Sequence, residues 1–206
     1  GERHKRHHHL REIGDTADAA ENDEGEQHQH AGGGDEAVRA DRPGDTGFRV
    51  WSTRFARIGV GICWDQWYPE TARAMMLMGA EVLFYPTAIG SEPQDPSLDS
   101  SAHWQRVMQG HAGANLVPLI AANRTGREQV RDFPQRYYGS SFIADQYGEQ
   151  VRKAGRDESA ILLHRFDLDA VAATRHAWGV FRDRRPACYG ILATSDGVHR
   201  TQEGAP

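Results

Sequence analysis

The chain has 206 residues and a formal net charge of −5, with 24 basic and 29 acidic side chains. This length suits one domain with a sizeable core, and the mild acidity gives no basis for binding nucleic acid or an anionic membrane surface. No apolar run is long enough to span a bilayer, and the polar start lacks the apolar core of a secretory signal, so we expect a soluble, cytoplasmic protein.

The amino-terminal segment, residues 1–42, differs in composition from the rest of the chain. It contains no aromatic side chain and few large aliphatic ones, but many Glu, Asp, His and Gly residues. Such a segment cannot bury enough apolar surface to offset its loss of conformational entropy, so we predict that it is disordered. Its histidines lack cysteine or carboxylate partners at a fixed spacing, and we expect no metal site there.

Residues 43–206 alternate between strand-like and helix-like segments. The run "FRVWSTRFARIGVGIC" predicts two short strands, the second being the buried stretch Ile58–Ile62. Pro69 then opens a helix that ends at Gly79, because proline suits the first helical turn and glycine suits a left-handed cap. A buried strand over 81–85 follows.

The carboxyl-terminal half continues this alternation. We predict a helix over 103–115, a strand that ends near Asn123, and a hairpin with its turn at 145–148. A last strand over 160–166 and a helix capped near Asp167 or Asp169 complete the pattern. Strands that alternate with helices indicate an α/β layered fold.

The cysteine in "GICWDQWYPE" occupies a position suited to catalysis. Cys63 follows a predicted buried strand and precedes a predicted helix, which places it at the rim of the sheet, where active sites of α/β folds gather. Backbone N–H groups of such a turn can stabilise an oxyanion during acyl transfer. The alternative is that Cys63 is a small buried hydrophobic residue. Cys188 has no comparable context, so we interpret it as structural, and the spacing of the two cysteines favours neither a disulfide framework nor a metal centre.

Four segments in order resemble one family. "RIGVGICWDQWYPETARAMMLMGAEVLFYPTAIGSEP", "HWQRVMQGHAGANLVPLIAANRTG", "YYGSSFIADQYGE" and "WGVFRDRRPACYG" are similar to the nitrilase superfamily of carbon–nitrogen hydrolases, and within it to N-carbamoylputrescine amidases. The resemblance covers about residues 43–197. It implies an αββα sandwich and hydrolysis of N-carbamoylputrescine to putrescine, carbon dioxide and ammonia, a step of polyamine synthesis, without a metal or an organic cofactor.

The resemblance also implies roles for individual residues. Cys63 matches the family's nucleophile, and the backbone N–H of Trp64 matches an oxyanion donor. In the family, a glutamate acts as general base and a lysine helps to stabilise the oxyanion. For substrate binding we select Glu92, a strand-end carboxylate suited to the substrate's ammonium group, and Trp67, although a solvated loop glutamate and a core aromatic remain alternatives.

The family's glutamate and lysine motifs are not found before Cys63. The chain has only two lysines, Lys5 and Lys153, against 22 arginines, and its early glutamates follow no apolar strand. We therefore expect residues 1–42 to be a disordered or frameshifted segment unrelated to the family, and residues 43–206 to be a partial domain that lacks the amino-terminal half of the sandwich.

Three functional hypotheses follow. The first is the amidase, with a small carbamoyl amine as its partner and a homo-oligomeric state if the protein is intact. The second is a catalytically inactive, truncated remnant that acts at most as a dimerising interaction module. The third is an amidase for another ureido or amide substrate, such as a β-ureido acid, which would require a basic residue in the pocket in place of an acidic one.

Overall fold

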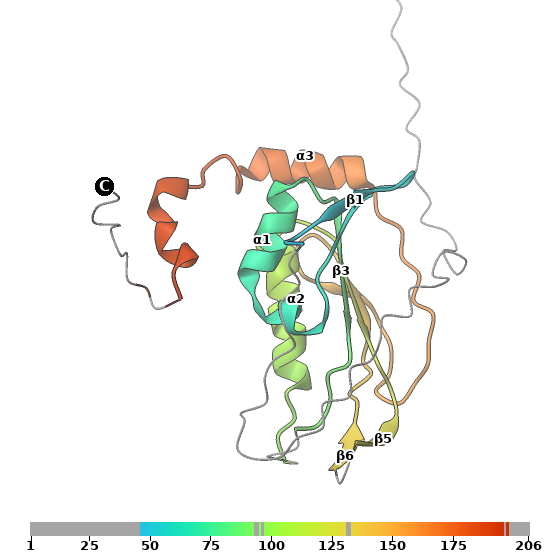
Figure 1. The fold of residues 1–206 in the computed structure, drawn as a ribbon. Helices are drawn as coiled ribbons and strands as arrows, with labels where there is room; N and C mark the ends of the chain where they lie inside the picture. Colours follow the sequence, from blue (N-terminus) through green and yellow to red (C-terminus); the bar gives the residue numbers. More distant parts are fainter. Residues whose placement is uncertain (1–45, 93–94, 96, 131–132, 196, 198–206) are drawn as a thin grey trace, which may run out of the picture.

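The structure, a computed structural model, describes residues 46–92, 95, 97–130, 133–195 and 197. The segment 1–42, which we predict to be disordered or frameshifted, lies outside these residues. The described part is an α/β fold built on one six-stranded sheet, with helices against it (Figure 1).

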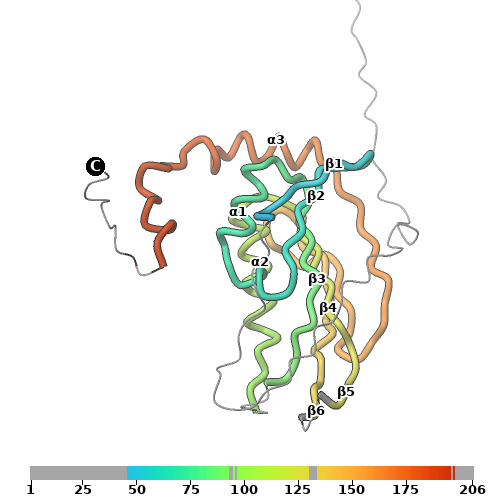
Figure 2. The backbone as a smooth tube through the Cα atoms, in the orientation of Figure 1, coloured from blue at the N-terminus to red at the C-terminus, as the bar shows by residue number. Residues whose placement is uncertain are grey.

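The sheet has the strand order β1-β2-β3-β4-β7-β8. Its three neighbouring strands β2, β3 and β4 are parallel, and the others pair antiparallel. Figure 2 traces how the chain passes from β2 to β3 and from β3 to β4, each time through a helix. Because the three parallel strands end at the same edge, the segments that follow them meet there. The strand bounds are Val50–Ser52 (β1), Arg57–Val60 (β2), Val82–Thr87 (β3), Leu119–Asn123 (β4), Phe142–Ala144 (β7) and Gln150–Lys153 (β8).

Helices α1 (Pro69–Leu77) and α2 (Ser101–Asn115) lie side by side against one face of the sheet (Figure 1). Alternation along β3 sends Leu83 and Tyr85 toward these helices, where both are fully buried. They join the main core cluster with side chains such as Met75, Trp104 and Leu119. This core fixes the two helices against the sheet.

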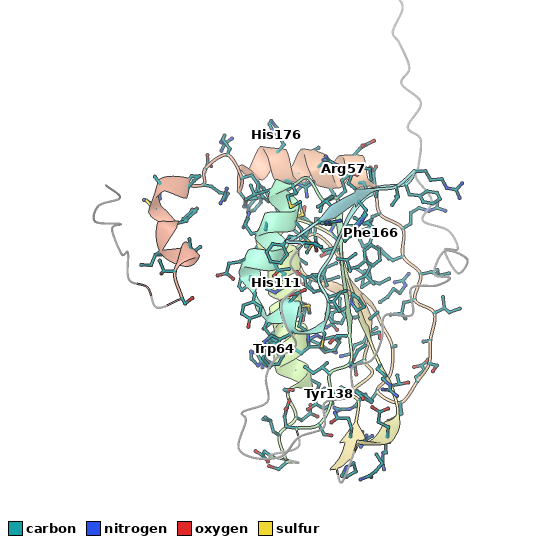
Figure 3. The ribbon with its side chains drawn as sticks, viewed as in Figure 1. Arg57, Trp64, His111, Tyr138, Phe166 and His176 are labelled. Carbon is teal, nitrogen blue, oxygen red and sulfur yellow. The ribbon has the colours of Figure 1, made fainter. Side chains whose placement is uncertain are left out.

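Helix α3 (Leu168–Trp178) lies at the end of the sheet where the parallel strands β2 and β3 begin, opposite the edge where they end. Its Leu168 packs with Ala56 and Val82 in a second, smaller cluster. Asp167 caps the helix by accepting a hydrogen bond from the N–H of Ala170, as the sequence predicts. Figure 3 shows His176 and Arg57 at this end, with Trp64 and Tyr138 toward the other.

Several predicted elements are confirmed with shifted bounds. The helix predicted from Pro69 is α1, and Gly79 follows it with a left-handed φ of 94°. The hairpin is formed by β7 and β8, and the N–H of Gly148 donates to the carbonyl of Asp145 in the turn. Strand β2 ends two residues earlier than predicted, because the chain turns at Gly61 toward the site.

One predicted strand is wrong. Residues 160–166 form no strand, although their composition is apolar. The segment has no backbone ladder partner, and Ile161 is 89% exposed, whereas Phe166 packs against the second cluster. Apolar composition alone therefore does not produce a strand when the segment pairs with no neighbouring strand.

The structure also contains a small hairpin that the sequence analysis does not predict. Strands β5 (Arg127–Val130) and β6 (Phe133–Arg136) pair antiparallel as a separate two-stranded sheet. The hairpin lies beyond the end of β4, next to the candidate site (Figure 1). Across the chain as far as it is described, none of the helices combines the length and apolarity needed to cross a bilayer.

Candidate active site

Cys63 begins a short turn immediately after β2. It is the first residue of the 3₁₀ helix η1 (Cys63–Trp67) and has a left-handed φ of 49°. For a residue with a side chain, this backbone conformation is strained, and such strain is concentrated at functional sites. The carboxylate of Asp65 supports the turn by accepting a hydrogen bond of 3.0 Å from the N–H of Ile62.

Gly61 allows this turn to sit directly on the core. A β-carbon at Gly61 would lie 2.7 Å from Cε1 of the Tyr85 ring, a distance that real side chains do not tolerate. The N–H of Gly61 also donates to the carbonyl of Phe84 at 3.0 Å. The absence of a side chain therefore lets the backbone approach β3 closely just before the cysteine.

A cavity of about 650 Å³ opens at the carboxyl ends of β2 and β3. Cys63 and Glu92 both line it, one from the turn after β2 and the other from the loop after β3. Glu92 is the one carboxylate among its described lining residues, which include no lysine or arginine. The full set is Cys63, Trp64, Gln66, Trp67, Ala88, Ile89, Gly90, Ser91, Glu92, Ser100, His103, Gln135 and Tyr137.

Two tryptophans supply much of the apolar wall. Trp64 and Trp67 face each other edge to face with ring centroids 6.4 Å apart, and the ring of His103 lies 5.1 Å from that of Trp67. Trp64 Nε1 donates to the hydroxyl of Tyr68 at 3.0 Å. The backbone N–H of Trp64 lies in the first turn of η1, where an amide has no acceptor within the helix. All four predicted site residues, Cys63, Trp64, Trp67 and Glu92, thus lie around the same cavity, while their chemical roles stay predictions.

A buried polar network under η1 escaped the sequence analysis. Gln66 is 1% exposed, and its Oε1 accepts a hydrogen bond of 2.7 Å from Trp104 Nε1. Its Nε2 donates to Thr87 Oγ1 at 3.1 Å. The carbonyl of Gln66 is 2.9 Å from His111 Nε2, and because a carbonyl only accepts, that ring nitrogen carries the proton. The sequence gives little indication that Gln66 is buried, because a glutamine between an aspartate and a tryptophan is not typical of a buried position.

Burial governs the titration of two groups beneath the site. Desolvation lowers the pKa of His111, although its contact with the Gln66 carbonyl and the nearby Glu70 charge act in the opposite direction. Burial, followed by the Asp65 charge, raises the pKa of Tyr85 far above its usual range. Both side chains therefore stay neutral at physiological pH and serve as parts of the support rather than as charged groups.

The loop that carries Glu92 is held by an asparagine from β4. The side chain of Asn123 accepts a hydrogen bond from the N–H of Ile89 at 2.9 Å and donates to the Ile89 carbonyl at 3.1 Å. It also donates to the carbonyl of Gly139 at 2.9 Å. These bonds fix the path of the chain three residues before Glu92.

Other candidate residues lie elsewhere. Lys153 in β8 donates to Gln105 Oε1 at 2.9 Å and does not line the cavity. Cys188, in the 3₁₀ helix η2 (Pro186–Cys188), is exposed, and both cysteines are free thiols. Where residues are described, no three His, Cys, Asp or Glu side chains are grouped to hold a metal ion.

Comparisons with known proteins identify the family of this chain. The profile of the carbon-nitrogen hydrolase family matches residues 2–176. N-carbamoylputrescine amidase from Oryza sativa subsp. japonica is 61% identical over 159 residues, which is 75% of this chain and 53% of that enzyme. Citrullinase from Francisella tularensis subsp. tularensis is 56% identical over 147 residues, which is 71% of this chain and 51% of that enzyme.

A solved structure gives the same result for the fold. The carbon-nitrogen hydrolase from Helicobacter pylori G27 is 40% identical and superposes with a TM-score of 0.69, covering 74% of this chain and 54% of that one. This chain therefore spans about half the length of the curated relatives and of the solved structure that it matches. The fold, the cysteine-bearing turn and these similarities together identify the chain as a member of the carbon-nitrogen hydrolase family.

Proposed function

We propose that this chain carries the nucleophile and the amine-binding part of a carbamoyl-amide hydrolase that acts on N-carbamoylputrescine. The observation that carries the proposal is the shared cavity of Cys63 and Glu92. The substrate has a neutral ureido group at one end and an ammonium group at the other, so it needs a nucleophile and a carboxylate that face the same space. The 61% identity to an N-carbamoylputrescine amidase supports this assignment.

The walls between these two residues suit the rest of the substrate. Trp64, Trp67 and Ile89 offer apolar surface to a chain of methylene groups. Glu92 would pair with the ammonium group through a charge-assisted hydrogen bond. The absence of lysine and arginine among the described lining residues leaves the attraction of that carboxylate for a cation unopposed.

The proposed reaction proceeds through Cys63. Attack of Sγ on the ureido carbon forms an S–C bond, and the N–H of Trp64 stabilises the negative charge on the oxygen. Breakage of one C–N bond then releases the first nitrogen, which takes the proton that the thiol gave up. Water breaks the S–C bond and restores the thiol. The carbamate that remains loses carbon dioxide and frees the second nitrogen, so one water is consumed overall.

A ureido amino acid is the second candidate substrate, because the citrullinase is 56% identical over 147 residues. Its carboxylate would need a cationic partner beside the ammonium site. The described lining residues include Glu92 and one histidine, His103, but neither arginine nor lysine. This charge pattern favours a substrate that ends in an amine alone.

The two free cysteines allow a test within one sample. The chain is treated with iodoacetamide, and the alkylation rates of Cys63 and Cys188 are followed by peptide mass spectrometry with and without N-carbamoylputrescine. We expect the compound to slow alkylation of Cys63 and to leave Cys188, which is exposed and outside the cavity, unchanged. Equal rates for Cys63 with and without the compound would count against the proposed function.

A further inference from the structure

We propose that the β5–β6 hairpin is the specificity element of this site, and that Gln135 and Ser91 are positioning residues that aim the Glu92 carboxylate at the substrate's ammonium group. The inference rests on the proposed function of Glu92. It adds a segment that lies outside the main sheet and contains no catalytic residue.

The contacts between the hairpin and the Glu92 loop centre on Ser91. The N–H of Ser91 donates to the carbonyl of Arg136 at 2.8 Å, and Ser91 Oγ accepts from the N–H of Arg136 at 3.0 Å. Gln135 Nε2 donates to the carbonyl of Ser91 at 3.0 Å. Every polar group of Ser91 is therefore bonded to β6, immediately before Glu92.

Gly90 brings the two backbones together. It forms an isolated antiparallel bridge with Tyr137, and a β-carbon at Gly90 would lie 2.3 Å from the Arg136 carbonyl oxygen. Any side chain at this position would push the loop away from β6. On the other side, Asn123 holds Ile89 through both of its backbone groups, so the loop is gripped from two directions.

The hairpin is itself anchored at its base. The hydroxyl of Tyr137 donates to Glu128 Oε1 in β5, and Arg124 donates to both Tyr137 and Glu128. The guanidinium of Arg124 also lies 4.4 Å from the centroid of the Tyr137 ring. Glu128 offsets the positive charge of Arg124. Arg124 therefore does not cancel the negative charge that Glu92 brings to the cavity.

The backbone just before Glu92 is held from both sides, which limits where the carboxylate can lie before the ligand arrives, so less conformational entropy is lost when the ligand binds. A ureido ligand without an ammonium group forms no ion pair with that carboxylate. Loosening the hairpin should therefore weaken binding of an amine-bearing ureido compound while sparing its neutral counterpart. This difference separates a positioning role from a general contribution to stability.

The experiment uses the full chain with Cys63→Ala, which removes the proposed nucleophile, and measures two dissociation constants by calorimetry. The ligands are N-carbamoylputrescine and N-butylurea, which has the same ureido group and chain but no amine. We expect the first to bind more tightly, and expect Gln135→Ala to reduce this preference by about threefold to tenfold. Ser91→Ala, which removes the acceptor for the Arg136 N–H, should act in the same direction.

Gln109→Ala is the matched control. Gln109 Nε2 donates to the carbonyl of Gly148 at 2.8 Å, so this change removes the same kind of bond from a part of the fold away from the cavity. We expect it to leave the preference unchanged. In a chain that also carries Glu92→Gln, Gln135→Ala should have no further effect on the preference, because the carboxylate that it positions is gone.

The outcomes separate the two proposals. A parent chain that binds neither ligand, or that does not prefer the amine, overturns the proposed function and this inference together. A preference that Glu92→Gln removes but Gln135→Ala leaves intact overturns the hairpin's role alone. If Gln135→Ala lowers the preference equally in the Glu92→Gln chain, Gln135 contacts the ligand directly and the positioning role is wrong.

Discussion

The ring of Tyr85 packs against the α-carbon of Gly61, two residues before Cys63. A β-carbon added there would meet Tyr85 Cε1 at 2.7 Å and Thr71 Cγ2 at 3.2 Å. Tyr85 is fully buried in the main core, so it cannot yield without disturbing neighbouring side chains. The position of the cysteine turn is therefore set by how closely β2 approaches β3.

Gly61→Ala should destabilise the protein by about 1–3 kcal/mol, because overpacking of a rigid core forces backbone and side-chain shifts. Urea unfolding followed by tryptophan fluorescence measures this change. Gly110→Ala is the control, since a β-carbon at Gly110, within α2, meets no atom within 4 Å. That variant should gain up to about 1 kcal/mol from the higher helix propensity of alanine. Equal effects of the two changes would show that contact with Tyr85 is unimportant.

Gln66→Met should cost about 1–3 kcal/mol, although the two side chains have similar volumes. The change removes the acceptor for Trp104 Nε1 and the donor to Thr87 Oγ1 in a buried environment. The same urea titration measures the cost. A loss of less than about 0.5 kcal/mol would mean that water or another group satisfies these partners.

The stability of the folded chain should fall as the pH drops below about 6.5, with part of this loss due to His111. Burial lowers the pKa of His111 in the folded state, so the unfolded chain takes up the proton first as the pH decreases. Stability from this group is complete above the unfolded pKa and is lost as the pH falls toward the folded pKa.

The change His111→Gln isolates that contribution. Urea midpoints at several values between about pH 7.5 and about pH 5 should decline more steeply for the parent chain than for the variant, because other titrating groups are common to both. Parallel pH profiles would show that His111 does not contribute to the loss.

Glu92→Gln should reduce the affinity of the Cys63→Ala chain for N-carbamoylputrescine by about tenfold, because a charge-assisted hydrogen bond is replaced by a neutral one. Glu92 is only half-buried, so solvent screens its charge and we expect a loss no larger than about tenfold. Binding of N-butylurea should not change. If both compounds lose affinity equally, Glu92 supports the loop and another group holds the amine.

The shared rim of Cys63 and Glu92 could be predicted because it depends on topology. Each residue follows a buried apolar run, and runs joined by a helix become neighbouring parallel strands whose ends meet. Helix α1 was equally predictable, since Pro69 and Gly79 mark its ends through local backbone preferences. The helix ends follow from local preferences, and the shared rim follows from a general rule for strands joined by a helix.

Features that depend on distant partners could not be predicted. The buried side chain of Gln66 has its partners far along the chain, in Thr87 and in Trp104, 38 residues later. The β5–β6 hairpin is rich in charged and polar residues and shows no strand alternation, yet its docking depends on Gly90. Residues 160–166 show the reverse case: this largely apolar run pairs with no neighbouring strand and forms none. In each case tertiary contacts outweigh local propensity.

Cys63 is the nucleophile if the ureido carbon of the substrate becomes attached to its sulfur. The full chain is incubated with N-carbamoylputrescine carrying a ¹³C-labelled carbonyl, quenched in acid, digested and analysed by mass spectrometry. We expect a labelled carbamoyl group on the Cys63 peptide and none on the Cys188 peptide. An unlabelled Cys63 peptide, in a sample where the compound protects Cys63 from alkylation, would contradict the assignment of Cys63 as the nucleophile.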